Sequence, residues 1–230
     1  MSNYPTIDTA LHWAAVVIYA MATVFNVSGL VFKKEKAERI SYAMVIGGLL
    51  IHGLALVSRW SVTGHGPYMV RYEVLSSNAW IVLCLFLFFS RIYPKIRPVS
   101  ILVFPSAIFM IPLSVFQDTA LRKVPPTLNS VWLVLHVSFI KIALGTLLVA
   151  LAFSISYILK TRTSMQWLER LPDPEMVDIY AYRFAGFGFI FWTNAVLSGA
   201  LWAYQSGGRF WGWDPIETWS LITWIFFAIY

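Results

Sequence analysis

The sequence predicts an all-α polytopic integral membrane protein, and the reasons are its composition and the length of its apolar runs. Hydrophobic residues make up 59% of the 230 residues and charged residues 12%, about half the charged share of a soluble domain. The apolar residues gather into runs of about 20, the length of a helix that crosses a bilayer. So few charges leave no basic stripe for nucleic acid, despite a net charge of +6. The single cysteine, Cys84, excludes a disulfide framework and a cysteine-ligated zinc site.

The runs predict six complete spans and a shorter seventh within a single domain, residues 1–230. The complete spans are expected at 10–32, 40–59, 75–93, 98–116, 129–159 and 184–204. Their length and lack of alternation favour helices over barrel strands. After the fifth span, Asp173 and Pro174 predict the start of a separate surface helix. The seventh run begins near Pro215 and stops after 16 residues at Tyr230. That is too short to cross a bilayer, so we expect a chain truncated within its seventh helix.

The basic residues predict the orientation, because cytoplasmic loops carry an excess of lysine and arginine. The loops after the first, third and fifth spans hold eleven of them: Lys33, Lys34, Lys36, Arg39, Arg91, Lys95, Arg97, Lys160, Arg162, Arg170 and Arg183. The opposite side holds five, which are Arg59, Arg71, Arg122, Lys123 and Arg209. The N-terminus is therefore expected outside, together with the segment that follows the sixth span.

An aromatic segment, residues 205–224, lies in that outer region. Five tryptophans fall within 23 residues: Trp202, Trp211, Trp213, Trp219 and Trp224. Such density, with glycines between, suits a platform for a flat conjugated ligand, and an interfacial tryptophan belt is the alternative. Asp214, Pro215 and Glu217 have the pattern of a helix start with Asp214 as the N-cap. A paired-carboxylate acid–base role is the other interpretation, but no nucleophile or metal cluster accompanies the two acids.

The run from Trp211 to Trp224, WGWDPIETWSLITW, closely resembles the tryptophan-rich WWD signature of haem-handling proteins. Within that family it is most similar to the CcsA (ResC) type rather than to the CcmF or CcmC type. Weaker upstream matches occur in the family's order: Arg59-Trp60, residues 64–67 (GHGP), Tyr72-Glu73 and residues 130–137 (SVWLVLHV).

This resemblance implies a carrier that receives haem b and holds it beneath the aromatic segment on the outer face. There the haem would be attached covalently to the CxxCH cysteines of apocytochrome c. The resemblance also implies a partner of the CcsB (ResB) type. The implied location is the bacterial inner membrane, in preference to a thylakoid membrane, with the aromatic segment on the periplasmic side.

Histidines decide where haem iron could bind, since it takes axial imidazoles. The fifth span is 31 residues, or about 46 Å, long and exceeds a hydrocarbon core of about 30 Å. His136 is therefore expected near the outer boundary, and it matches the family's outer haem-ligand histidine. His52 is expected roughly 10 Å inside the bilayer; the resemblance makes it the ligand of a second, intramembrane haem, and a helix–helix hydrogen bond is the alternative. In the family pattern, the partner histidines of both sites follow the aromatic segment, beyond Tyr230.

The remaining predicted cofactor-binding residues are Trp211, Trp213, Asp214, Trp219 and Arg209. Arg209 is the first choice for a haem propionate, followed by Arg71 and Lys141. Lys141 also fits snorkelling of its long stem to the lipid head groups. His65 fits a solvated turn, and His12 fits a place at the membrane interface.

Two other functions remain open from the residues. A b-type electron-transfer subunit would hold haem between helices, but such subunits place two histidines on each of two helices, and here no span has two. A solute transporter would leave His136 and residues 214–219 unexplained. Thioether formation would use the substrate's thiols and the haem vinyl groups, so the chain's share would be holding and orienting them. The residues leave open whether it is an enzyme.

Overall fold

The computed structural model describes residues 7–115, 120, 122, 124–125 and 128–230; Lys123, one of the five outer basic residues, lies outside them. All regular elements in the described part of the chain are helical. A 3-10 helix, η1 (Pro94–Val99), leads into α4, and a second, η3 (Gln166–Arg170), follows α5. The α-helices are α1 (Ile7–Val31), α2 (Glu35–Thr63), α3 (Arg71–Ile92), α4 (Ser100–Val115), α5 (Val131–Arg162), α6 (Pro174–Gly207) and α7 (Pro215–Ile229).

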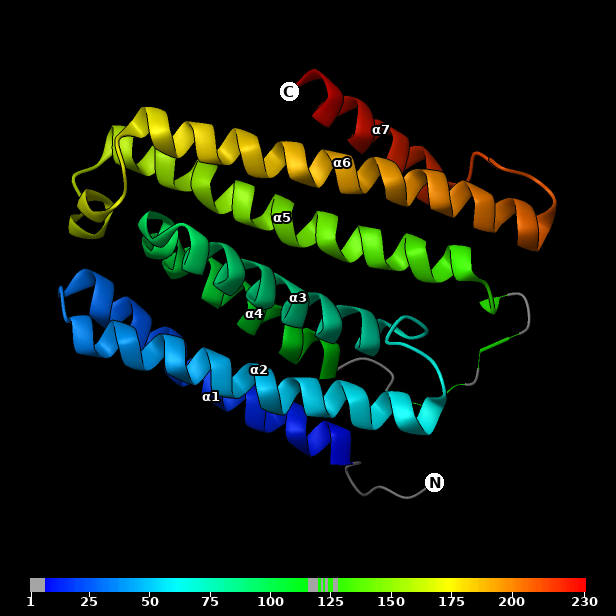
Figure 1. The fold of residues 1–230 in the computed structure, drawn as a ribbon, viewed down its shortest axis with the longest axis horizontal. Helices are drawn as coiled ribbons and strands as arrows, with labels where there is room; N and C mark the ends of the chain where they lie inside the picture. The colour runs from blue at the N-terminus through cyan, green and yellow to red at the C-terminus, as the bar shows by residue number, and fades with distance from the viewer. Residues whose placement is uncertain (1–6, 116–119, 121, 123, 126–127) are drawn as a thin grey trace.

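Six helical segments of the described chain are long and apolar enough to cross a membrane, the fourth being Pro94–Leu113. The predicted polytopic all-α fold is therefore confirmed. The seventh helix, α7, has 15 residues and is the shorter element that the sequence predicts. Successive helices run in opposite directions and form the pairs α1–α2, α3–α4 and α5–α6 (Figure 1).

The three pairs are joined by contacts of α1 with α4 and of α3 with α5, and α7 packs against α6 at the edge of the bundle (Figure 1). Small residues allow the helices to approach closely. At the α5–α6 contact, for example, a Cβ on Gly188 would lie 2.5 Å from the side chain of Leu147. Phe153 and Phe184 stack at the same contact, with ring centroids 5.6 Å apart.

Three segments that are far apart in the sequence lie together at one end of the bundle. The first turn of α1, the α2–α3 connection (64–70) and the α6–α7 connection (208–214) all lie there (Figure 1). We call it the aromatic end. The predicted alternation of the spans requires this grouping, because these segments are separated by even numbers of crossings.

The start of α6 corrects one expectation. The sequence predicts a separate surface helix at Pro174 and a span from 184, whereas α6 runs without interruption from Pro174 to Gly207. Asp173 occupies the N-cap position, but its side chain makes no capping hydrogen bond. A helix can continue into the aqueous phase because its backbone bonds are satisfied internally, so hydropathy alone does not mark its end.

Arg59, one of the five basic residues counted on the outer side, lies in the last turns of α2 at the aromatic end. Its side chain is only 3% exposed and bonds to two acids. Its Nε donates to Glu73 Oε1 at 2.7 Å and its Nη1 to Asp8 Oδ2 at 3.3 Å. Arg59 therefore fastens α2 to α1 and α3 at the aromatic end.

Candidate functional site

The candidate site is a pocket of about 650 Å³ at the aromatic end, between α5, α6 and the start of α7. We call it the aromatic pocket. Four predicted site residues line it: His136, Trp211, Asp214 and Trp219. Trp192 and Trp202 of α6 line it as well. A volume of this size lies within the range of about 300–1,000 Å³ that is usual for cofactor sites.

The acids of the aromatic segment build the start of α7. Asp214 is the N-cap, and its Oδ1 accepts from the backbone N–H of Glu217 at 2.9 Å. The Glu217 carboxylate reaches back and accepts from the N–H of Gly212 at 2.6 Å. Asp214 therefore satisfies a backbone donor that a helix start leaves unpaired, and Glu217 ties the preceding loop to the helix at Gly212. The predicted helix start is confirmed.

Tryptophan side chains dock α7 onto α6. Trp192 donates its indole N–H to the carbonyl of Ser220 at 3.2 Å, and Trp224 donates to Thr193 Oγ1 at 2.9 Å. These two bonds hold α7 across the side of the pocket, so the tryptophan-rich sequence closes one wall of the cavity.

His136 lines the pocket, and one of its ring nitrogens has no hydrogen-bond partner among the described residues. Its Nδ1 lies 2.7 Å from the carbonyl oxygen of Ala195, and because a carbonyl can only accept, Nδ1 carries the proton. In the neutral ring Nε2 then keeps its lone pair, which is the form that binds a metal. Gly199 makes room for the ring, since a Cβ there would lie 2.7 Å from Nδ1. Trp202 stacks on the imidazole, with ring centroids 6.5 Å apart and an interplanar angle of 24°.

Two indole nitrogens beside the pocket have no acceptor. The Nε1 atoms of Trp202 and Trp211 are buried, and neither has a hydrogen-bond partner among the described residues. A buried donor without a partner costs about 1–3 kcal/mol. Both tryptophans line the aromatic pocket.

The other residues of the aromatic segment lie at the rim. Trp219 lines the pocket but is 68% exposed, and Trp213 is 70% exposed and outside the lining. Trp213 has a positive φ of 58°. Its ring lies edge to face with that of Trp211, with ring centroids 5.9 Å apart. Arg209 also lies outside the lining, with its guanidinium folded over Gly212, where a Cβ would meet it at 2.9 Å.

His52 lies apart from the aromatic pocket, inside the bundle. It is fully buried, with Nε2 2.8 Å from Ser76 Oγ and Nδ1 3.4 Å from the hydroxyl of Tyr19. His52 and His136 therefore occupy separate environments on different helix pairs, and their different depths in the bilayer stay a prediction.

His12 is the residue that the sequence interpretation missed. It was expected at the interface, but it is fully buried, with Nε2 2.6 Å from the same Ser76 Oγ and Nδ1 2.6 Å from the carbonyl of Asp8. Tyr72 lies beside it, with its hydroxyl 2.8 Å from Nδ1. In the sequence, Asp8, one turn before His12, is the one local sign of a polar environment. The partners Ser76 and Tyr72 belong to α3 and cannot be inferred from the sequence of α1.

Lys141 and His65 also differ from their expected surroundings. Lys141 does not snorkel: it is 6% exposed and donates to Ser77 Oγ and Asn78 Oδ1 on α3. His65 is buried rather than solvated, and its ring nitrogens lie 2.7 and 2.8 Å from the carbonyls of Gly66 and Arg122. Neither residue lines the aromatic pocket.

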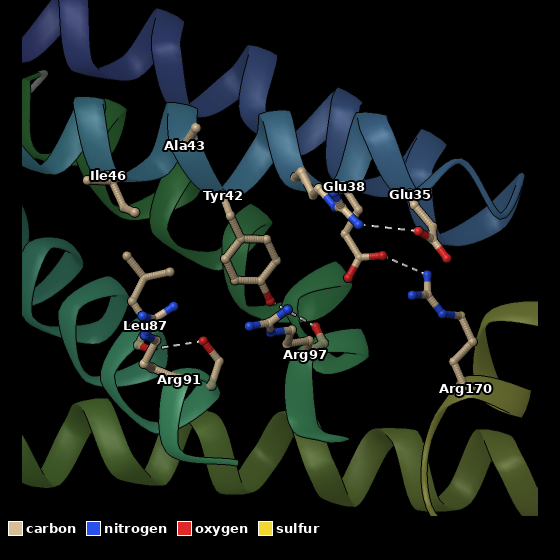
Figure 2. A pocket seen from close by; sticks show the side chains of 11 residues that line it. Glu35, Glu38, Tyr42, Ala43, Ile46, Leu87, Arg91, Arg97 and Arg170 are labelled. Atoms are coloured by element: carbon tan, nitrogen blue, oxygen red, sulfur yellow. Dashed lines mark hydrogen bonds and ion pairs between the residues drawn. The ribbon is translucent and has the colours of Figure 1, made fainter. Parts of the chain in front are cut away.

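A polar hollow of about 480 Å³ lies at the opposite end of the bundle, between α2, α3 and the loops (Figure 2). Arg170 pairs with Glu38 at 2.8 Å and Arg39 with Glu35 at 3.6 Å. Arg97 lies over the Tyr42 ring, 5.8 Å from its centre. No predicted site residue lines this hollow, which belongs to the predicted cytoplasmic side.

Haem fits the donor set of the aromatic pocket. The pocket offers one imidazole lone pair at His136 Nε2, flat indole walls, and two N–H donors that a propionate could accept from. Among the described lining residues His136 is the one histidine, so this lining would supply a single imidazole to haem iron.

Comparison with known proteins gives a consistent result. Residues 11–230 match the model of a family described as "Cytochrome C assembly protein". A cytochrome c biogenesis protein CcsA of Prochlorococcus marinus (strain MIT 9312) is 33% identical over 94% of this chain and 78% of its own length. The CcsA of Chlamydomonas reinhardtii is 35% identical over 89% of this chain and 60% of its own length. The CcsA of Chlorella vulgaris is 28% identical over all of this chain and 85% of its own length.

Proposed function

Because this chain belongs to the cytochrome c assembly protein family and has a role in cytochrome c biogenesis, we propose that its aromatic pocket holds haem b. The proposed task is to present that haem for covalent attachment to the CxxCH cysteines of apocytochrome c on the outer side of the membrane. The observation that carries this proposal is the position of His136, which lines a tryptophan-rich cavity and is held through Nδ1 by the carbonyl of Ala195.

The Ala195 carbonyl fixes the tautomer and direction of the His136 ring, and such orienting partners increase the affinity of a histidine for its metal. Trp211 and Trp219 provide the flat walls. The unpaired N–H groups of Trp202 and Trp211 suit the propionates, and we propose Arg209, at the rim, as a charged partner for them. Trp213, edge-on to Trp211, would support that wall, and Asp214 would keep it in place by capping α7.

The chain's own residues would bind, orient and shield the cofactor, while haem supplies its vinyl groups for thioether formation. In this proposal the pocket excludes water on the α5–α6 side and leaves the rim at Trp213 and Trp219 accessible to a second protein. Their exposure of 70% and 68% supports this rim as the place where apocytochrome c approaches.

We propose His52 as the ligand of a second haem on the route to the outer site. Its burial in the bundle and its separation from the aromatic pocket support two sites rather than one. Its Nε2 is engaged by Ser76 at 2.8 Å, so a ligand role requires that this hydrogen bond be given up.

The membrane and the partner are part of the proposal. The chain is a multi-pass membrane protein. We propose that it lies in the bacterial inner membrane with the aromatic end periplasmic and that it works with a CcsB-type (ResB-type) membrane protein. The excess of basic residues at the other end supports this orientation.

The alternative function is a b-type haem subunit for electron transfer. The buried pair His12 and His52 on α1 and α2 is the observation that favours it. A pyridine haemochrome spectrum of the purified protein tests haem binding. Deletion of the gene then separates the two functions: loss of holocytochromes c with other haem proteins intact supports the proposal, whereas normal holocytochromes c overturn it.

A further inference from the structure

A second cavity at the aromatic end lies between α2, α3 and α5 and is bounded by the loop of residues 64–68. It has a volume of about 930 Å³, and its walls are mainly leucine, valine and tryptophan side chains. We call it the lysine pocket, because Lys141 lines it. His136 and Lys141 are five positions apart on α5, which places them roughly 140° apart around the helix axis. The lysine pocket is therefore distinct from the aromatic pocket.

Lys141 is a buried amine whose described hydrogen-bond partners are neutral, while the carboxylate of Glu73 acts on it only through space. Its Nζ donates to Ser77 Oγ at 2.5 Å and to Asn78 Oδ1 at 3.2 Å. The ion pairs within the described residues do not include it. An ionisable residue within a membrane span is costly unless it is paired, and it usually marks a functional site. An ammonium group has three donors, so one remains after these two bonds.

The rest of the pocket is suited to an apolar body. Trp80 donates its indole N–H to the carbonyl of Leu49 at 3.0 Å, so its polar atom is satisfied and its ring is a wall. Burial raises the pKa of Tyr68, at the loop side, above its ordinary value, which keeps the phenol neutral. Lys141 is the one lysine or arginine among the described lining residues, which are mostly apolar; the other polar side chains of the lining are His65, Tyr68, Ser77 and Ser138.

We propose that the lysine pocket binds an amphiphile with an anionic oxygen head, either a phosphodiester or a carboxylate. The head pairs with Lys141, and the apolar body lies along α2 and Trp80. Phospholipids and haem propionates share this head chemistry. Lys141 is 6% exposed, which favours a small head group at the end of a flexible body over a rigid helix of another protein. The proposal is independent of haem binding in the aromatic pocket.

Two kinds of variant test the lysine pocket: one removes its charge, and the other fills its cavity. Lys141→Met removes the charge at similar length, and Lys141→Arg keeps it. Gly53→Leu fills the cavity without changing charge: Gly53 lines the pocket, and the nearest atom to a Cβ there is Trp80 Nε1 at 3.4 Å, an ordinary contact. Gly47→Leu is the matched control on the same helix, since nothing lies within 4 Å of its Cβ and it does not line the pocket.

The experiment measures what the purified protein retains from nanodiscs of equal phosphatidylcholine and phosphatidylglycerol, by native mass spectrometry, with haem measured by pyridine haemochrome. We expect retained phosphatidylglycerol to fall about tenfold in Lys141→Met and Gly53→Leu but not in Lys141→Arg or Gly47→Leu. If retained haem falls in Lys141→Met and Gly53→Leu but not in the two controls, while retained lipid is unchanged, the site is also supported. The anionic head group of the ligand is then a haem propionate. Unchanged lipid and haem in Gly53→Leu and Lys141→Met overturns the proposal. So does crosslinking of the pocket to a helix of another protein.

Discussion

The imidazole rings of His12 and His52 lie 5.0 Å apart at an angle of 70°. Both Nε2 atoms lie within hydrogen-bond distance of one hydroxyl, Ser76 Oγ, at 2.6 and 2.8 Å. A serine hydroxyl has one proton to donate and two lone pairs, so α1, α2 and α3 meet at a single small polar group. Any metal that binds His52 through Nε2 competes with Ser76.

This competition gives the first prediction. His52→Ala removes the proposed inner ligand, so the outer site should be poorly loaded and holocytochrome c should fall. Ser76→Ala frees His52 Nε2 and should leave haem content the same or higher, despite a stability cost of about 1–3 kcal/mol for the unpaired nitrogens. Haem is measured by pyridine haemochrome and maturation by haem-stained gels. Normal haem and maturation in His52→Ala would make His52 a packing residue.

The second prediction concerns orientation. Eleven of the seventeen basic residues lie on the side opposite the aromatic end in the predicted topology, so a reporter fused after Arg162 should be cytoplasmic. A reporter fused at Gly208 should be external, because the positive-inside rule places the less basic side outside. Paired phosphatase and fluorescent-protein fusions measure both positions. A cytoplasmic signal at Gly208 would remove the outer haem site.

The spans and the start of α7 could be predicted because their causes are local. Hydropathy over about 20 residues marks a span, and Asp214 caps a helix through its near neighbour Glu217. The same reasoning divides α6, since its first ten residues, Pro174 to Arg183, are polar enough to be assigned to a separate surface helix.

The buried polar residues could not be placed in this way. Arg59, His12 and Lys141 each depend on partners from other helices, and a residue's own helix does not reveal them. For Lys141, for example, the sequence leaves open a propionate partner and snorkelling to the head groups, whereas α3 presents Ser77 and Asn78 to it. Long-range pairing determines these environments, so a single sequence leaves them open.

Arg59 provides the third prediction. Arg59→Met leaves the carboxylates of Asp8 and Glu73 buried beside each other, and breaking a buried ion pair in this way costs about 3–5 kcal/mol. Thermal unfolding in detergent should show a clear fall in the midpoint. The double variant Arg59→Met/Glu73→Gln should recover part of the loss, because one buried charge is removed. A double variant as unstable as the single one would show that the ion pair is not the cause.

The fourth prediction tests the two unpaired indole donors. Trp211→Phe and Trp202→Phe keep an aromatic wall but remove the N–H, so haem retention should weaken by about 1.5–3 kcal/mol for each bond to a charged propionate. Haem dissociation to apomyoglobin measures the effect. Trp132→Phe is the control, because Trp132 lies at the start of α5 but outside the pocket lining. Equal retention in all three variants would leave the tryptophans with a packing role alone.

The last prediction tests His136 through its own geometry. His136→Ala should lower haem retention without preventing membrane insertion, because the residue is not needed for the span. Trp219 lines the pocket and is 68% exposed, so added imidazole should enter, take the place of the missing side chain and restore part of the haem spectrum. Imidazole should not restore haem in His52→Ala, since the position of His52 is fully buried.

Gly199→Ala provides a second approach: its Cβ would lie 2.7 Å from His136 Nδ1, so the ring must shift and its bond to Ala195 must weaken. Disturbing such an orienting bond lowers metal affinity about 10–100-fold, and imidazole should compensate there as well. If imidazole restored His52→Ala as well as His136→Ala, or neither, the assignment of His136 to the accessible site would be wrong.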